Sequence, residues 1–217
     1  MTYPFIEDEQ FHNRINRIYK RFAIPKKRKT MRQICFPRKY ELQMPQKFVS
    51  KYINPNTPYK GILVFHRLGA GKTCTAIRVG EEWKKYRKIM VLTPASLKGN
   101  FRKDLRSGCT GSAYLTNSER SKLKMLHPAS KEYKGIIKES DKRIDKHYEI
   151  HSYNKFVDLY ANGKISLKNK VLIIDEVQNM ISEDGTFYET IYDAIYTAPK
   201  SLRIVLLSAT PMFDKPI

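Results

Sequence analysis

Residues 61–73 read Gly-Ile-Leu-Val-Phe-His-Arg-Leu-Gly-Ala-Gly-Lys-Thr, and this stretch decides the fold. An apolar run of strand length ends at Phe65, a glycine-rich segment follows, and an amphipathic stretch begins at Lys72. This order of strand, loop and helix is the context that a phosphate-binding loop requires. Gly69 and Gly71 permit backbone torsions and a close approach that side chains would block, so successive N–H groups can surround phosphate oxygens. The stretch therefore predicts a nucleotide site beside an α/β sheet.

The side chains at the end of this loop have distinct expected roles. Lys72 is expected to reach the β- and γ-phosphates of ATP, and the Thr73 hydroxyl to bind the Mg²⁺ that bridges them. His66 departs from the general pattern GxxxxGK[ST], because it stands where the first glycine is expected. An ordinary glycine-rich turn is the alternative interpretation, and the flanking strand and helix argue against it. The predicted ATP-binding segment consists of Leu68, Gly69, Ala70, Gly71, Lys72, Thr73 and Cys74.

Further apolar runs of strand length follow along the chain, at residues 89–93, 171–175 and 204–207. Because these runs and residues 61–65 are continuous and rich in β-branched residues, they are expected to be strands buried on both faces. The stretches between them predict helices at residues 72–86, 96–105, 154–161 and 186–195. This alternation predicts an α/β fold of the P-loop NTPase type, with a mostly parallel sheet and helices on both faces.

Two segments lie outside this alternation. Residues 1–40 are expected to form an N-terminal extension, in which Phe11, Ile15, Ile18 and Phe22 share one face of a helix. The basic run at residues 26–29 could contact nucleic acid, but a solvated linker is the favoured interpretation in a lysine-rich chain. Residues 117–147 mix basic and acidic residues with few apolar positions, which predicts a polar surface insertion that is helical in part.

The charge of the chain favours an anionic partner. It contains 41 Lys and Arg against 21 Asp and Glu, a net charge of +20, and 41% hydrophobic residues, which is enough for a folded core. Such a surplus attracts polyanions, and its contacts with phosphates release counterions from nucleic acid. The alternative interpretation is that the charge only keeps the protein surface soluble. No apolar run has the length of a signal peptide core or a membrane span, so an intracellular protein without a membrane partner is expected.

Three cysteines, Cys35, Cys74 and Cys109, are widely spaced and lack a Cys/His pairing at metal-ligand spacing. Their odd number and spacing predict a reducing compartment and no disulfide. Cys74 is expected to be a small packed residue rather than a reactive thiol.

An acidic pair follows the strand predicted at 171–175, where the sequence reads Asp175-Glu-Val-Gln178. Carboxylates at the carboxyl end of a parallel strand face the crevice where ligands bind. Beside a phosphate loop, Asp175 would bind the Mg²⁺ shell and Glu176 would polarise the attacking water, so Lys72, Glu176 and Gln178 are the candidate catalytic residues. Acids that merely end a strand and cap the next helix are the alternative.

The last predicted strand runs into Ser208-Ala-Thr-Pro211. With this segment, three motifs stand in the order GxGKT, DExQ and SAT, which resembles the first motor domain of superfamily two helicases and translocases. The resemblance implies a RecA-like domain in which Ser208 and Thr210 couple the ATP state to movement along nucleic acid. A metabolic kinase or a small GTPase would explain the phosphate loop but not the other two motifs.

The resemblance extends to weaker motifs. Val91-Leu-Thr-Pro94 is similar to the family's motif Ia, which implies that Thr93 and Pro94 contact the sugar-phosphate backbone of nucleic acid. The segment at Ser152 is similar to a later region of the family that contacts the nucleic-acid strand. Leu42-Gln-Met-Pro-Gln46 is similar to the segment in which a glutamine reads the adenine edge. The resemblance makes Gln46 the candidate for this role, with Gln43 as the alternative.

The function that the resemblance implies is an ATP-binding lobe, residues 41–217, of an ATP-dependent helicase or translocase that uses ATP and Mg²⁺. Nucleic acid is the expected substrate, DNA more than RNA. A complete member has a second motor domain, absent from these residues, so the chain by itself is expected to hydrolyse ATP poorly. A scaffold with a relic ATP site is disfavoured because Lys72, Thr73, Asp175 and Glu176 are all present.

Among such motors, the chain most resembles helicases of large nucleo-cytoplasmic DNA viruses. These include the small subunit of the poxvirus early transcription factor and nucleoside triphosphate phosphohydrolase I. The alternative function is therefore an ATPase subunit of a viral early transcription initiation or termination factor that remodels complexes without unwinding. In that case viral transcription machinery is an expected partner, and the virion or the host cytoplasm is the expected location.

Overall fold

A parallel sheet forms the centre of the computed structural model, which describes residues 3–25, 40–66, 69–180 and 186–210. Its strand order is β1-β5-β4-β2-β3, and all four strand pairings are parallel. The four strands predicted from sequence are present, each within a residue of the predicted ends. The strands are β1 (Gly61–Phe65), β2 (Lys88–Thr93), β3 (Tyr148–Ser152), β4 (Lys170–Ile174) and β5 (Arg203–Ser208).

The strand β3 was not among the predicted strands. Its sequence, Tyr-Glu-Ile-His-Ser, alternates buried Tyr148 and Ile150 with half-buried polar residues, because β3 is the edge of the sheet. An edge strand with a polar face lacks the continuous apolar run that marks the other strands.

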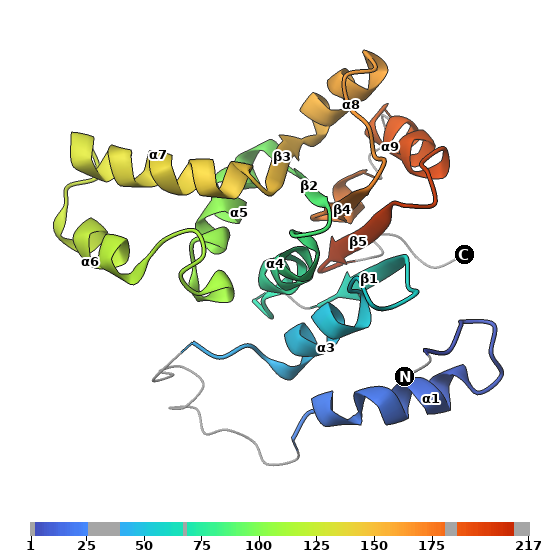
Figure 1. Cartoon of the computed structure of the whole chain (residues 1–217). Helices are drawn as coiled ribbons and strands as arrows, with labels where there is room; N and C mark the ends of the chain where they lie inside the picture. Colours follow the sequence, from blue (N-terminus) through green and yellow to red (C-terminus); the bar gives the residue numbers. More distant parts are fainter. Residues whose placement is uncertain (1–2, 26–39, 67–68, 181–185, 211–217) are drawn as a thin grey trace.

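Helices precede, connect and cover the strands (Figure 1). The predicted helices are all present, and Phe11 to Phe22 form α1 and a 3₁₀ turn. The helices of the described residues are α1 (Phe11–Tyr19), α3 (Met44–Tyr52), α4 (Lys72–Trp83), α5 (Lys98–Leu105), α6 (Asn117–Met125), α7 (Lys131–Asp145), α8 (Tyr153–Ala161) and α9 (Thr186–Tyr196). The 3₁₀ turns are η1 (Lys20–Phe22), η2 (Ala95–Leu97), η3 (Gly108–Thr110) and η4 (Val177–Met180).

Apolar cores lie on both faces of the sheet, as predicted. On one face Ile173 and Val205 pack with Ile77 of α4 and Phe101 of α5. On the other face lies a second cluster, made of Met90, Leu92, Leu172 and Ile174 with Phe156 of α8 and Ile191 of α9. Each fully buried aliphatic side chain contributes about 1.5–3 kcal/mol, so the strand residues that carry the site are held rigidly.

The prediction that residues 61–65 are buried on both faces is wrong. Leu63 and Phe65 of β1 are 53% and 56% exposed. Both lie on the same face as Leu206 of β5, and the α8/α9 layer covers β4 and β2 rather than β1, which is the other edge of the sheet.

The N-terminal helix packs against α3 on the side away from the sheet (Figure 1). The Tyr19 ring of α1 meets the Phe48 ring at 5.2 Å, and the Phe11 ring of α1 meets the Tyr59 ring at 6.3 Å. The Tyr19 hydroxyl donates to the Lys51 carbonyl at 3.1 Å. These aromatic contacts attach the predicted N-terminal extension to the domain, and the basic run at 26–29 lies outside the described residues.

The segment 117–147 is mostly α6 and α7, which project from the β3 edge of the sheet (Figure 1). Arg102 of α5 holds α7 through Asp141 at 2.8 Å and Asp145 at 2.6 Å. The polar, partly helical insertion predicted from sequence is confirmed. Among the described residues, no helix is both long and apolar enough to cross a membrane.

Candidate nucleotide-binding site

The loop between β1 and α4 has the backbone that its glycines permit. Gly69 and Gly71 have φ angles of +78° and +77°, a region that side chains rarely adopt. A Cβ atom on Gly71 would lie 2.6 Å from the Gln46 side-chain nitrogen, so a larger residue would displace the Gln46 amide as well as strain the backbone. The loop ends at Lys72, the first residue of α4, where unpaired backbone N–H groups favour phosphate.

Gln46 supports this loop from α3. It is 4% exposed, its Nε2 donates to the Gly71 carbonyl at 3.3 Å, and its Oε1 accepts from the Gln43 N–H at 2.9 Å. The Thr75 hydroxyl donates to the same Gly71 carbonyl at 3.2 Å. Gln46 therefore contacts the loop, whereas Gln43 contacts Gln46, and recognition of adenine by Gln46 stays a prediction.

The acidic pair lies against the phosphate loop. Asp175 and Glu176 follow β4, which is separated from β1 only by β5, and Lys72 Nζ lies 3.6 Å from Glu176 Oε1. The Lys72 side chain is 8% exposed, so this ion pair is largely removed from water. Residues about one hundred positions apart in sequence thus form one charged site.

The backbone at Glu176 is unusual, because its φ angle is +55°. Non-glycine residues in this region carry strain, and such strain is concentrated at functional sites. The Tyr153 hydroxyl of α8 donates to the Asp175 carbonyl and to the Glu176 carbonyl, the latter at 3.1 Å. Tyr153 therefore holds the acidic turn, and nothing in its local sequence singles it out for this role.

Burial raises the pKa of Asp175 from 3.8 to about 6, with a further rise from the neighbouring Glu176 and an opposing effect of Lys72. Asp175 is 6% exposed, so its ionised form lacks the solvation that it would have in water. A buried carboxylate of this kind is a strong acceptor for a metal ion or a donor group.

Replacing Asp175 by asparagine is expected to stabilise the ligand-free fold at pH 8. A carboxyl with a raised pKa binds its proton more tightly in the folded chain, so the wild type loses stability as the pH rises from about 4 to about 6. At about 1.4 kcal/mol for each pKa unit, the wild type loses at most about 3 kcal/mol of its free energy of unfolding above pH 6. Asp175→Asn should therefore gain about 1–3 kcal/mol at pH 8 and little at pH 4.

Urea unfolding at both pH values measures this difference, and exposed Asp158→Asn is the control. An equal gain from Asp175→Asn at pH 4 and pH 8 would contradict the expected effect of burial.

A chain of side-chain hydrogen bonds connects the acidic turn to the last strand. Gln178 Nε2 donates to Glu176 Oε2 at 2.6 Å, and the Ser208 hydroxyl donates to Gln178 Oε1 at 2.8 Å. The Thr210 N–H donates to the Ser208 hydroxyl oxygen at 3.1 Å. The predicted catalytic and coupling residues are therefore directly connected, and a change at Glu176 can reach the end of β5.

His66 is close to the same site. The backbone N–H of His66 donates to the Ser208 carbonyl at 3.2 Å. The Nδ1 atom of the imidazole ring is buried and has no partner among the described residues. Burial lowers the pKa of His66, and so does Lys72. The sequence marks His66 only as a departure from the loop pattern, and Leu68 lies outside the described residues.

The candidate nucleic-acid contacts lie at the carboxyl ends of β2 and β3. Thr93 and Ser152 are paired in the register of these strands. Thr93 is fully buried and its side chain interacts with the carboxyl of Asp175, where it opposes the rise in pKa that burial causes, whereas Pro94 is half-buried. The Ser152 hydroxyl accepts from the Lys155 N–H at 3.4 Å and caps α8. Contact of Thr93, Pro94 and Ser152 with nucleic acid stays a prediction.

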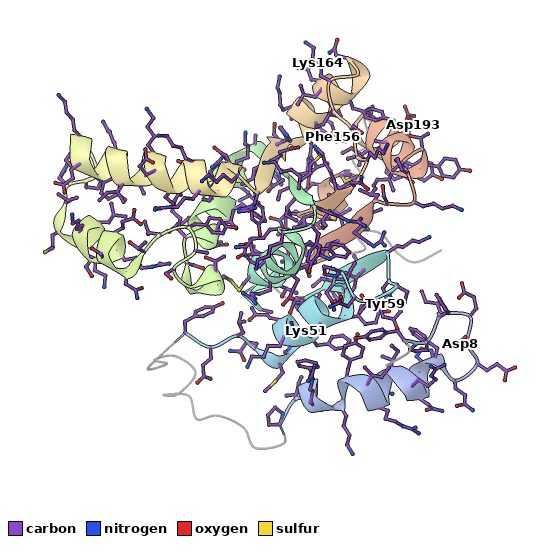
Figure 2. The ribbon with its side chains drawn as sticks, in the orientation of Figure 1. Asp8, Lys51, Tyr59, Phe156, Lys164 and Asp193 are labelled. Carbon is purple, nitrogen blue, oxygen red and sulfur yellow. A yellow bond between two sulfur atoms is a disulfide. The ribbon has the colours of Figure 1, made fainter. Side chains whose placement is uncertain are left out.

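The prediction that the chain contains no disulfide is wrong. Cys74 of α4 and Cys109 of η3 are joined, with their Cα atoms 5.8 Å apart (Figure 2). This Cα separation is in the usual range for a bridge. The pairing arises because η3 packs on α4, which the separation of 35 residues in sequence does not reveal. Cys35 lies outside the described residues.

The chain is similar to several known proteins. The family model ResIII, described as the res subunit of type III restriction enzymes, matches residues 34–213. A protein of Acanthamoeba polyphaga mimivirus named as an ATP-dependent RNA helicase is 58% identical over 216 residues, which is 100% of this chain and 38% of that protein. A protein of African swine fever virus named as a homolog of the termination factor NPH-I is 24% identical over 163 residues, 72% of this chain and 21% of that protein.

A solved structure shares the fold. The helicase domain of Hef from Pyrococcus furiosus matches with a TM-score of 0.51 and 19% identity, over 86% of this chain and 36% of that chain. The chain spans 38% of the length of the mimivirus relative and smaller shares of the other viral relatives named here.

Proposed function

The chain belongs to the ResIII family and is a RecA-like helicase lobe, and from this premise we propose that it binds ATP and Mg²⁺ to drive movement along nucleic acid. The observation that carries the proposal is the approach of Lys72 to Glu176 beside a glycine loop at the start of α4. An ammonium group, two carboxylates and a cluster of free N–H groups are the parts that phosphoryl transfer to water requires.

The residues present fit a magnesium nucleotide. Mg²⁺ prefers oxygen ligands, and the buried carboxylate of Asp175 and the hydroxyl of Thr73 are of this type. When bound, the metal would neutralise the charge that develops on the phosphate oxygens. Lys72 would bind the terminal phosphates, and the N–H groups after Gly69 would hold the others in place.

Glu176 would orient the attacking water and accept its proton. The carboxylate is half-buried and is held by Gln178, so its position is set before substrate binds. Loss of the γ-phosphate would change the charge next to Glu176, and the hydrogen bonds through Gln178 and Ser208 would carry that change to Thr210. This connection supports the proposed coupling of the ATP state to movement.

Replacing Lys72 by alanine is expected to weaken ATP binding by roughly 30- to 150-fold, since charge-assisted hydrogen bonds contribute about 2–3 kcal/mol. Titration of the 217-residue chain with a fluorescent ATP analogue and Mg²⁺ measures the affinity, and exposed Lys85→Ala is the matched control. Circular dichroism checks that both variants fold. Unchanged affinity of a folded Lys72→Ala variant would remove the basis of the proposal.

Nucleic acid is the proposed substrate of the motor. The net charge of +20 favours binding to its phosphates, and the relatives named as helicases support the same class of substrate. Contacts that follow the nucleic-acid backbone carry no base identity. Binding of DNA in preference to RNA is a separate part of the proposal, and competition between the two tests it.

A second candidate function is remodelling of a viral transcription complex without unwinding. The similarity to an African swine fever virus protein named as a termination factor homolog favours it. A strand-displacement assay on a chain extended to the length of the mimivirus relative separates the two functions. Displacement of a paired strand supports the helicase, and nucleic-acid-stimulated ATP hydrolysis without displacement supports the remodelling factor.

A further inference from the structure

The outer face of α7 carries a row of lysines. Lys131, Lys134, Lys138 and Lys142 recur every three or four residues and are all exposed, and we call them the α7 lysine stripe. The opposite face of α7 packs inward through Ser140 and Ile144, both fully buried. In Figure 2 side chains with nitrogen tips extend from the side of α7 that faces away from α6.

Three acidic residues of this insertion point away from the stripe. Asp141 and Asp145 bind Arg102 of α5 at 2.8 and 2.6 Å, and Glu119 of α6 binds Arg143 at 2.8 Å. These ion pairs attach α7 to α5 and to α6. The other acids of α7, Glu132 and Glu139, are exposed.

The lysines have little compensation of this kind. Lys142 pairs with Glu139 at 2.6 Å, in an ion pair whose side chains are 61% and 59% exposed. In the described residues, Lys131, Lys134 and Lys138 make no ion pair. The solvent side of α7 thus carries four lysines against two exposed acids, Glu132 and Glu139, and its charge is positive.

Helix stability does not account for this arrangement. Lys131 is the first residue of α7, at the end of the helix where the macrodipole is positive and a cation is unfavourable. Lys134, Lys138 and Lys142 stand four residues apart, a spacing at which like charges destabilise a helix by about 0.2–0.5 kcal/mol a pair. Lys142 is stabilised, because it lies in the last turn of α7 and pairs with Glu139. Within the part of the chain that the structure describes, Lys131, Lys134 and Lys138 have no such contact and cost folding energy, so their charges point to a partner.

We infer that the α7 lysine stripe binds the phosphate backbone of a nucleic-acid duplex beside the motor lobe. The inference rests on the proposed function only for the class of partner. Four lysines span about 16 Å of a straight helix, over which a duplex presents roughly nine to ten phosphate charges. No aromatic residue belongs to the stripe, so it lacks the stacking platform that holds the bases of a single strand.

The test compares two triple variants of the 217-residue chain that lose the same charge. One is Lys131→Ala, Lys134→Ala, Lys138→Ala in the stripe. The control is Lys60→Ala, Lys85→Ala, Lys200→Ala, three exposed lysines outside α7. Alanine is a good helix former, so the stripe variant should fold.

Affinity for a short fluorescent duplex is measured between 50 and 200 mM salt. Loss of three phosphate contacts lowers the salt slope by about 2.7, so the wild type and the control should lose roughly 40-fold more affinity across this range than the stripe variant. A third variant with arginine at the three stripe positions should behave as the wild type, because it keeps the charge.

Two results would overturn the inference while leaving the proposed function intact. Equal effects of the stripe and control variants would show that only the overall charge attracts the duplex. A larger effect of the stripe variant on a single strand than on the duplex would show that the partner is wrong. If the wild type bound neither nucleic acid at 50 mM salt, the inference and the proposed substrate would both fail.

Discussion

A chain extended through a second motor lobe is expected to hydrolyse ATP about 10³–10⁵-fold faster, in the presence of nucleic acid, than the 217-residue chain. The described site brings together Lys72, the two carboxylates and Ser208, a candidate coupling residue, and all of them come from one domain. The resemblance to superfamily two motors implies arginine fingers from a second lobe, and an arginine finger is worth about this factor in other phosphate-transferring enzymes.

The comparison uses the 217-residue chain and a version that continues through the length its mimivirus relative has beyond the matched region. Steady-state phosphate release with DNA, with RNA and with neither measures the rates. Separate titrations with ATP should show that both chains bind the nucleotide. Rapid turnover by the 217-residue chain, stimulated by nucleic acid, would show that no second lobe is needed and would reject this prediction.

In the extended chain, replacing Glu176 by glutamine is expected to lower turnover by about 10²–10⁴-fold, the usual contribution of a general base. Glutamine has nearly the same shape, and its carbonyl oxygen can still accept the hydrogen bond from Gln178. It cannot accept a proton from the attacking water. The affinity for ATP should therefore stay close to that of the wild type, because Lys72 remains in place.

Single-turnover hydrolysis, measured together with nucleotide binding, separates these two effects. Glu189→Gln, a charge-removing change at an exposed position of α9, is the matched control and should leave turnover unchanged. If Glu176→Gln lowered binding and left the rate of the bound complex unchanged, Glu176 would hold the site together rather than assist the water.

Much of the fold follows from local pattern. The strands β2, β4 and β5 are continuous apolar runs because they are interior strands of the sheet, and such runs are readable in a single sequence. The phosphate loop is readable for a similar reason. Its glycines meet torsional and steric demands within a few residues of one another, as the φ angles of Gly69 and Gly71 show.

Other features were missed because they depend on distant neighbours. The edge strand β3 has a polar face, so its pattern did not identify it, and the exposure of Leu63 and Phe65 depends on where the α8/α9 layer ends. Tyr153 supports the acidic turn across 22 residues, and Cys74 meets Cys109 across 35. No spacing rule within one segment contains these contacts.

The sequence by itself determined the parallel α/β fold, the phosphate loop and the presence of an acidic pair, because each depends on residue types within a short segment. Only the tertiary structure decided that Lys72 meets Glu176, that Gln178 connects Glu176 to Ser208, and that Asp141 and Asp145 of the insertion turn inward to Arg102. The physical reason is that strand order, rather than distance along the chain, decides which strand ends are neighbours. The order β1-β5-β4 brings the three motifs together at the carboxyl ends of these parallel strands.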